Sequence, residues 1–289
     1  MSNVVLFGGD DNTATSPDMW TYDGSSWTSA TPGNPPPHRE ESAMAMLDGN
    51  AVLFGGSPSG QGDVIGDTWV WNGATWTQTH PAHSPPARCY HSMATLGSTV
   101  VLYGGTDGTT QLSDTWTWDG TDWTGHVVTP PPARQSAMMA TLGNDVVLFG
   151  GAGGADGMTE QSDTWIWNGS AWSMPSTSSS PSARDSAIMF GVGGVVVLFG
   201  GQDVNANALS DTWTWSGTGW SQENALVTSP PGRFAAAGAV LHTQLMIFGG
   251  TTNVGNDMTD TWIWDGTQWF AGPVTGPGAR AWAAMTGPG

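Results

Sequence analysis

The sequence predicts an all-β protein in which residues 1–289 form a single six-bladed β-propeller domain of four-stranded antiparallel blades. Two observations lead to this prediction. Apolar runs that end in a glycine pair recur at intervals of 46 to 50 residues, and each of the six copies contains two tryptophans seven residues apart. A unit of this length holds four short strands but cannot bury its apolar faces alone, so the units are expected to pack radially.

Each repeat has the pattern of four strands in order. The first follows an arginine and is rich in small and apolar residues, as in residues 136–142. The second is a continuous apolar run such as residues 146–149, which is typical of a strand buried on both faces. The third, such as residues 163–167, alternates aromatic with other residues, and the Asn-Gly or Asp-Gly pair after it predicts a tight hairpin into the fourth.

The two chain ends predict how the ring closes. From Arg280 the chain runs nine further residues to its end, and if Ser2 is counted as the tenth, Gly8 is the sixteenth. Sixteen is also the spacing from the arginine to the glycine pair in the other five repeats. We therefore expect the last blade to take its first strand from residues 280–289 and its other strands from residues 2–27.

Composition excludes several classes of function. The formal net charge of −18 argues against nucleic acid or an anionic membrane as a partner, because both require a basic surface. No run of 18 apolar residues and no signal-peptide pattern is present, so we expect a soluble monomer, with its localisation left open and an extracellular parent included. The single cysteine and the scattered histidines predict no disulfide, no cofactor and no metal site, although calcium binding by loop aspartates stays open.

Two residue types recur once in every repeat and are candidates for one shared role. The six arginines are the only basic side chains apart from histidine: Arg39, Arg88, Arg134, Arg184, Arg233 and Arg280. An aspartate lies two residues before the first tryptophan of each repeat: Asp18, Asp67, Asp114, Asp163, Asp211 and Asp260. The arginines either gather at the mouth of the central channel and bind an anionic ligand, or form bidentate structural latches with these aspartates.

Residues that differ between repeats are the better functional candidates. The position two after each arginine holds Glu41, Tyr90 and Trp282 in three repeats and Ser or Ala in the others. If this series lines the channel, these three side chains, together with His91, form an aromatic and polar pocket suited to a sugar or a peptide; the alternative is packing between blades. Loops of variable length on the same face favour a binding surface there.

The apolar strand that ends in a glycine pair, the later aromatic pair and the period near 48 resemble the kelch repeat along the whole chain. The sequence departs from that family in the third strand, where only Tyr22 keeps the usual tyrosine and tryptophan replaces it elsewhere. The resemblance implies a non-catalytic module that binds a peptide, a protein or a glycan, and in adaptor kelch propellers arginines at this place contact acidic peptides. The alternatives are a channel enzyme similar to bacterial sialic-acid mutarotases, using Glu41, His91 and a ring arginine, and a purely structural or engineered repeat scaffold. No catalytic residue is assigned.

Overall fold

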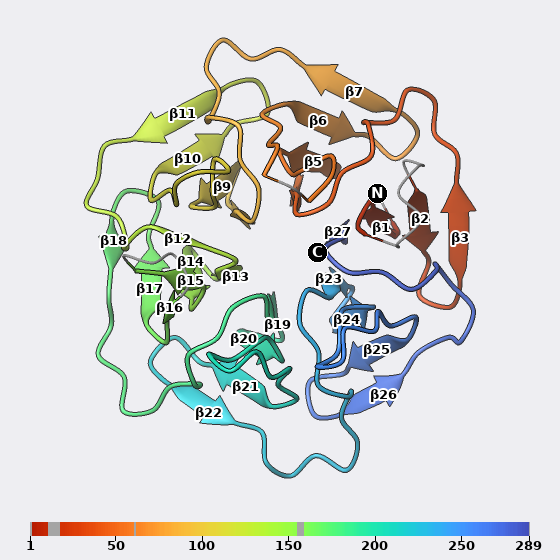
Figure 1. The fold of residues 1–289 in the computed structure, drawn as a ribbon, viewed down its shortest axis with the longest axis vertical. Coiled ribbons are helices and arrows are strands. Elements are labelled where there is room, and N and C mark those ends of the chain that lie inside the picture. Colours follow the sequence, from red (N-terminus) through yellow and green to blue (C-terminus); the bar gives the residue numbers. More distant parts are fainter. Residues whose placement is uncertain (1, 11–17, 61, 155–158, 289) are drawn as a thin grey trace.

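The computed structural model describes residues 2–10, 18–60, 62–154 and 159–288, and within these ranges the protein is all-β. Its sheets are arranged around a common centre, with successive strands of each sheet lying progressively farther out (Figure 1). All strand pairs are antiparallel, as expected for a β-propeller. No helix in the described ranges is long and apolar enough to cross a membrane.

Six of the sheets have four strands each, written here in spatial order. The first three are β27 (Ala284–Thr286), β1 (Val4–Phe7), β2 (Met19–Tyr22) and β3 (Trp27–Ala30); β4 (Ala43–Leu47), β5 (Asn50–Phe54), β6 (Thr68–Trp71) and β7 (Trp76–Thr79); and β8 (Ser92–Leu96), β9 (Thr99–Tyr103), β10 (Thr115–Trp118) and β11 (Trp123–His126). The others are β13 (Met138–Leu142), β14 (Asp145–Phe149), β17 (Thr164–Trp167) and β18 (Trp172–Ser173); β19 (Ile188–Val192), β20 (Val195–Phe199), β21 (Thr212–Trp215) and β22 (Trp220–Gln222); and β23 (Ala237–Leu241), β24 (Gln244–Phe248), β25 (Thr261–Trp264) and β26 (Trp269–Ala271).

A seventh, three-stranded sheet is formed by β12 (Arg134–Gln135), β15 (Ala152–Gly153) and β16 (Thr159–Glu160). It joins the residue after an arginine to the loop that follows the glycine pair. Other repeats make the same contact as isolated bridges, for example Cys89 with Thr106. The small sheet is therefore the longest instance of a loop pairing that recurs around the ring, and it does not correspond to an additional sequence repeat.

Strand β1 pairs with one strand that is close in the sequence and with one from the other end of the chain. On one side it pairs with β2, and on the other it pairs with the C-terminal strand β27, with Val5 opposite Thr286. The C-terminal strand β27 lies near the centre of the arrangement, with β1 beside it (Figure 1). Residues 11–17 and 289 of the expected seam fall outside the described ranges.

The core lies between neighbouring sheets. The second strand of each sheet is almost wholly buried because apolar side chains cover both of its faces. Phe54 of β5, for example, packs edge-on against Trp123 of the next sheet, with ring centroids 5.3 Å apart. The indole Nε1 of Trp123 donates a hydrogen bond of 2.9 Å to Thr68 Oγ1. The polar atom of this large buried side chain therefore has a partner across the interface between the two sheets. The same indole–threonine contact recurs at four other interfaces.

The hairpin predicted between the third and fourth strands is present, and its connection has four residues. The connection from β2 to β3 spans the four residues 23–26, and Asp23 Oδ1 accepts hydrogen bonds from the backbone N–H groups of Ser25 and Ser26 at 2.8 and 2.9 Å. An Asp or Asn side chain can cap a wider loop in this way, so the Asp-Gly signal does not fix loop length. A two-residue turn does occur at Asp48-Gly49, between the first and second strands.

Candidate functional site

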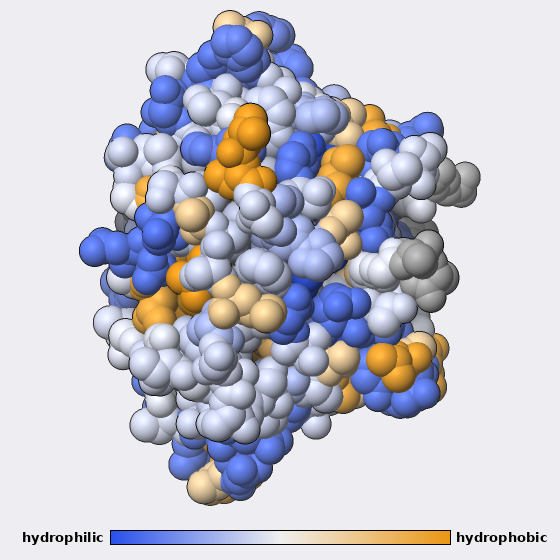
Figure 2. Space-filling model, turned by 90° about the vertical axis from the view of Figure 1, so that its left-hand side faces the viewer, coloured by the Kyte–Doolittle hydropathy of each residue, from blue (hydrophilic) through white to orange (hydrophobic). Residues whose placement is uncertain are grey.

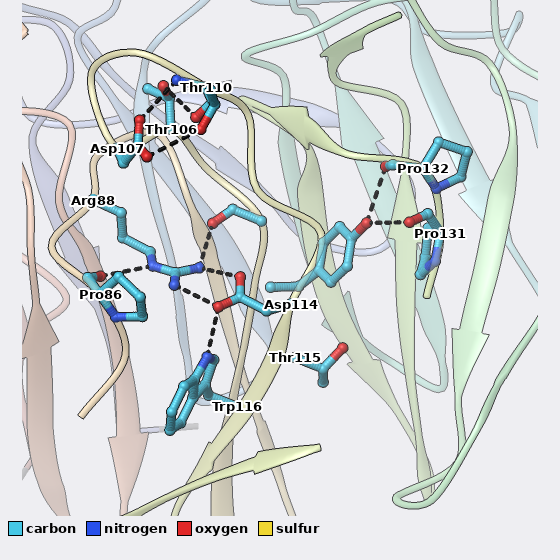
Figure 3. A network of polar contacts seen from close by, with 12 residues as sticks. Pro86, Arg88, Thr106, Asp107, Thr110, Asp114, Thr115, Trp116, Pro131 and Pro132 are labelled. Atoms are coloured by element: carbon cyan, nitrogen blue, oxygen red, sulfur yellow. Dashed lines mark hydrogen bonds and ion pairs between the residues drawn. The ribbon is translucent and has the colours of Figure 1, made fainter. Parts of the chain in front are cut away.

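The side chain of Arg88 holds together the start of one repeat and the sheet that follows it (Figure 3). Its Nη1 donates to Asp114 Oδ1 at 2.6 Å and to the carbonyl oxygen of Gly104 at 2.9 Å. Its Nη2 donates to Asp114 Oδ2 at 2.7 Å, and its Nε donates to the carbonyl oxygen of Pro86 at 3.0 Å. Asp114 Oδ2 also accepts from Trp116 Nε1 at 2.7 Å. Four of the five guanidinium N–H groups are therefore used inside the protein.

The other repeats build the same ion pair, which we call the latch. The remaining pairs and their N–O distances are Arg39–Asp67 (2.5 Å), Arg134–Asp163 (2.6 Å), Arg184–Asp211 (2.6 Å), Arg233–Asp260 (2.7 Å) and Arg280–Asp18 (2.5 Å). Every arginine side chain is at most 3% exposed. Burial alone would raise the pKa of Asp114, but the hydrogen bonds from Arg88 and its charge outweigh that effect and lower it. The carboxylate is thus held ionised against its partner.

The glycine pair contacts two arginines: the one sixteen residues upstream, whose Nη1 donates to the carbonyl oxygen of the first glycine, and the one of the next repeat. A Cβ atom on Gly104 would lie only 2.7 Å from the carbonyl oxygen of Arg134, the arginine of the next repeat, and φ at Gly104 is +67°. Gly105 N donates to that same carbonyl at 3.0 Å, while the Arg134 side chain reaches forward to Gly150. Each arginine thus bridges two sheets, and only a residue without a side chain fits between them.

Two residues beyond each arginine, the backbone forms a closed ring of hydrogen bonds. At this position each N–H donates to the carbonyl oxygen of the equivalent residue in the preceding repeat, and each residue has a positive φ between 51° and 60°. The bonds run from Tyr90 to Glu41 (3.0 Å), Ser136 to Tyr90 (2.8 Å), Ser186 to Ser136 (3.0 Å), Ala235 to Ser186 (2.9 Å), Trp282 to Ala235 (2.9 Å) and Glu41 to Trp282 (3.1 Å). We call these six residues the rim. The bond from Glu41 to Trp282 joins the first and last of these six residues in the sequence.

The rim surrounds a cavity of about 200 Å³ at one mouth of the channel. Three rim side chains are large, and the other three are Ser136, Ser186 and Ala235, so the hollow is asymmetric. Tyr90 and Trp282 meet edge to face with ring centroids 5.1 Å apart. Methionines five residues after the arginine line the cavity in five repeats: Met44, Met93, Met139, Met189 and Met285. No arginine in the described ranges is among the lining residues.

Glu41 is a buried carboxylate without a cationic partner. Its side chain is in a residue only 8% exposed, and it accepts hydrogen bonds from the Tyr90 hydroxyl and the Cys89 thiol. Burial raises the pKa of Glu41, and burial together with the Glu41 charge raises the pKa of both donors. The adjacent Glu40 has its pKa raised to about 7 by burial and by the charges of Glu41 and Asp10. This part of the rim therefore holds two neighbouring carboxyl groups whose ionisation is disfavoured by burial and which have no cationic partner.

Two further polar side chains line the same cavity without a hydrogen-bond partner. His91 is 6% exposed, packs edge-on against Phe54, and has no group in hydrogen-bond geometry with either ring nitrogen, although the Phe54 backbone weakly favours the protonated ring. Burial and the Arg88 charge lower the pKa of His91 to about 3, so the ring is neutral at neutral pH. Ser42 Oγ is likewise unpaired. Both groups are buried in the cavity wall, and unpaired indole nitrogens occur elsewhere in the described residues, as at Trp118.

The opposite end of the channel holds a second cavity, of about 540 Å³, that sequence reasoning did not predict. It is lined by Met46, Thr95 and His242 among others, and Phe190 lies between the two cavities. Position five after the arginine is glycine in only one repeat, and a Cβ on that residue, Gly238, would lie 2.5 Å from the Phe190 ring. The Met-to-Gly change in the repeat pattern was the available signal for this packing.

Within the described part of the chain, no group of three His, Cys, Asp or Glu residues is placed to hold a metal ion. The sequence matches the KLHDC2/KLHL20/DRC7 kelch-repeats domain over residues 1–151, 76–250 and 114–286. No curated protein matches at a significant level. The matched ranges together span nearly the whole chain and carry the glycine pairs, latches and aromatic pairs described above. The chain therefore belongs to the KLHDC2/KLHL20/DRC7 family of kelch-repeat domains.

Proposed function

We propose that the protein is a non-catalytic binding module whose ligand site is the cavity bounded by the rim, with Ser42 and His91 in its wall; we call this site the cup. The observation that carries the proposal is the contrast in side chains at equivalent backbone positions. The latch residues are the same in every repeat, whereas the rim residues differ and leave a hollow edged by Glu41, Tyr90 and Trp282. A kelch-repeat domain suggests a protein–protein interaction module. A segment of a peptide, a protein or a glycan is the class of ligand that such a cup accommodates.

We further infer that the six four-stranded sheets are six blades and that the blade containing β1 is closed by the C-terminal strand. Three contacts support this inference: the strand pairing of Val5 with Thr286, the latch between Arg280 and Asp18, and the backbone bond from Glu41 to Trp282. A closed ring has no free sheet edge at its seam, which favours a monomer. The six arginines then serve as latches, because their N–H groups are directed into the protein.

The geometry gives less support to an enzyme that uses Glu41 and His91 as an acid–base pair. The hydrogen bonds to the Glu41 carboxylate come from Tyr90 and Cys89, and His91 makes none. A general base must reach the proton that it abstracts, and His91 instead packs against Phe54 inside the wall. Binding therefore accounts for the site better than catalysis.

A binding screen with a cup variant and a matched aromatic control tests the proposal. The wild-type protein, Trp282→Ala and Phe270→Ala are compared on arrays of peptides and glycans; Phe270 lies on the outermost strand β26 and is 52% exposed. We expect ligands that bind the wild type and Phe270→Ala but lose binding to Trp282→Ala. The proposal fails if no ligand distinguishes the two variants.

A further inference from the structure

The charge balance of the protein leaves the cup without any cation. The chain has 24 acidic residues and six basic ones, and all six basic residues are arginines that form latches. Subtracting one aspartate for each latch leaves 18 carboxylates with no lysine or arginine to offset them. On the side of the molecule in Figure 2, apolar residues are scattered among predominantly hydrophilic ones, as expected for this composition. An anionic ligand would meet repulsion here, whereas a cationic ligand would be attracted.

The large residues of the rim have the chemistry that recognises a cation. The Glu41 carboxylate offers about four acceptor sites, of which Tyr90 and Cys89 occupy two. Tyr90 and Trp282 flank Glu41 in the rim and present aromatic rings to the cavity. Aromatic faces attract ammonium and guanidinium groups, and the attraction is strongest where water is excluded. A cation in the cup would therefore contact a carboxylate and two aromatic side chains together.

Recognition of a cation would fall to Glu41, Tyr90 and Trp282. Ser42 and His91 also belong to residues that line the cavity, but their polar atoms are buried in its wall and do not face its open space. The three large rim side chains therefore occupy one sector of the cavity. The opposite sector of the cavity is open because its rim residues have small side chains: Ser136, Ser186 and Ala235.

We propose that the cup binds the ammonium or guanidinium group of a lysine or arginine side chain in a basic polypeptide. This proposal rests on the proposed function that the cup is the ligand site, and it names the chemistry of the ligand. A cavity of about 200 Å³ accommodates one such side chain, while the rest of the partner lies over the loops around the mouth. The latches cannot provide the recognition, because their guanidinium groups are buried and paired.

The test compares four capped tripeptides that differ only in the residue between two glycines: lysine, arginine, norleucine or glutamate. Norleucine keeps the alkyl chain of lysine and removes the charge. Affinities are measured by calorimetry or by NMR titration for the wild type, for Glu41→Gln, and for Glu40→Gln as a matched carboxylate control, because Glu40 does not line the cavity. Thermal melting of each variant checks that it is folded.

We expect lysine or arginine to bind at least about tenfold more tightly than norleucine, a difference of about 1.4 kcal/mol, and glutamate to bind not at all. Glu41→Gln should weaken binding by about tenfold and Glu40→Gln by less than threefold. Binding of norleucine as tight as that of lysine, or equal losses in the two variants, would overturn the proposal. If Glu41→Gln does not fold, the comparison of lysine with norleucine on the wild type decides alone.

The same data separate this proposal from the broader one. If Trp282→Ala loses binding of a neutral glycan or an acidic peptide while lysine and arginine peptides do not bind, the cup is a ligand site and its assignment to cations is wrong. If no ligand binds in a manner that depends on Trp282, both proposals fail.

Discussion

The latches and the rim lie only two residues apart in every repeat, yet they differ in almost every physical respect. All six latches use an arginine side chain that is at most 3% exposed and whose N–H groups donate to partners within the protein. At the rim, the backbone is the same six times over, but the side chains range from alanine to tryptophan. The latch repeats its chemistry, and the rim repeats only its geometry.

This difference teaches where function can arise in a repeat protein. The sheets have to be joined in the same way at each interface, so the residues that join them cannot diverge. The rim is held by N–H to carbonyl bonds, which do not depend on the side chain, and it is therefore free to vary. Asymmetry in a symmetric backbone is thus the signal of a ligand site.

The largest effect is expected from deleting residues 280–289, which removes the Arg280 latch, strand β27 and the rim bond to Glu41. This leaves β1 as an open edge and Asp18 without its partner. We expect a protein that does not fold, or one whose Tm falls by more than about 10 °C. Circular dichroism melting measures this, and an unchanged Tm would show that the ring does not close through the chain ends.

Removal of one latch is expected to have the next largest effect. Arg134→Ala removes the arginine donors to Asp163 and to the carbonyl of Gly150, and leaves Asp163 with only the Trp165 indole as a side-chain donor in a largely buried site. Breaking such a pair costs about 3–5 kcal/mol, because the remaining charge stays uncompensated. Denaturant unfolding of the variant and the wild type measures the loss. A loss below about 1 kcal/mol would mean that the latch behaves like an exposed ion pair.

A smaller effect on stability is expected from pH. Its sign differs between the buried carboxyl groups beside the rim and the aspartates of the latches. Burial raises the pKa of Glu40 to about 7 and that of Asp185 to about 6. At pH values above the ordinary pKa of a carboxyl group, the folded state therefore binds more protons than the unfolded state. Stability should therefore fall as pH rises from about 5 to 8. Five of the latch aspartates have lowered pKa values, so their contribution is lost only as pH falls below about 4; these are Asp67, Asp114, Asp163, Asp211 and Asp260.

Melting curves between pH 4 and pH 9 measure this dependence. Glu40→Gln should raise the Tm at pH 8 and flatten the fall between pH 5 and 8. A wild-type Tm that rises steadily over that interval would contradict the burial of unpaired carboxylates beside the rim.

The smallest effect is expected from glycine at the rim. Ser136 has φ of +53°, a conformation that costs a residue with a side chain roughly 1 kcal/mol. Ser136→Gly should therefore raise the free energy of unfolding by about 0.5 kcal/mol. The control is Ala137→Gly at the next residue, which lacks a positive φ. This substitution should lower the free energy of unfolding by about 0.5 kcal/mol. Urea unfolding distinguishes the two, and equal losses would mean that the rim is not strained.

Much of the scaffold was predictable from the sequence, because it follows from spacings that recur. The sixteen-residue interval from Arg280 through the chain end to Gly8 indicated the pairing of β27 with β1. The aspartate that recurs in every repeat indicated a latch, but the sequence left open the alternative that the arginines bind a ligand. Only the structure, in which Arg88 is buried beside Asp114, distinguishes the two.

The hydrogen-bonded rim could not be predicted, because Tyr90 and Trp282 carry no local preference for a positive φ and take it from contacts with neighbouring repeats. The packing of Phe190 over Gly238 depends on two repeats meeting in space. Relations between repeats, unlike those within one, leave little trace in a single sequence.

The most direct test uses two variants of one repeat, Arg184→Lys and Ser186→Trp, each measured for Tm and for affinity to the lysine tripeptide. Arg184→Lys should lower the Tm, because lysine cannot form the bidentate pair with Asp211, and should leave affinity within about threefold. Ser186→Trp should fill the cup and weaken binding by at least about tenfold, with little change in Tm, because Trp282 already adopts the same backbone conformation. The reverse outcome, in which the latch variant loses binding and the rim variant loses stability, would contradict the division between scaffold and site.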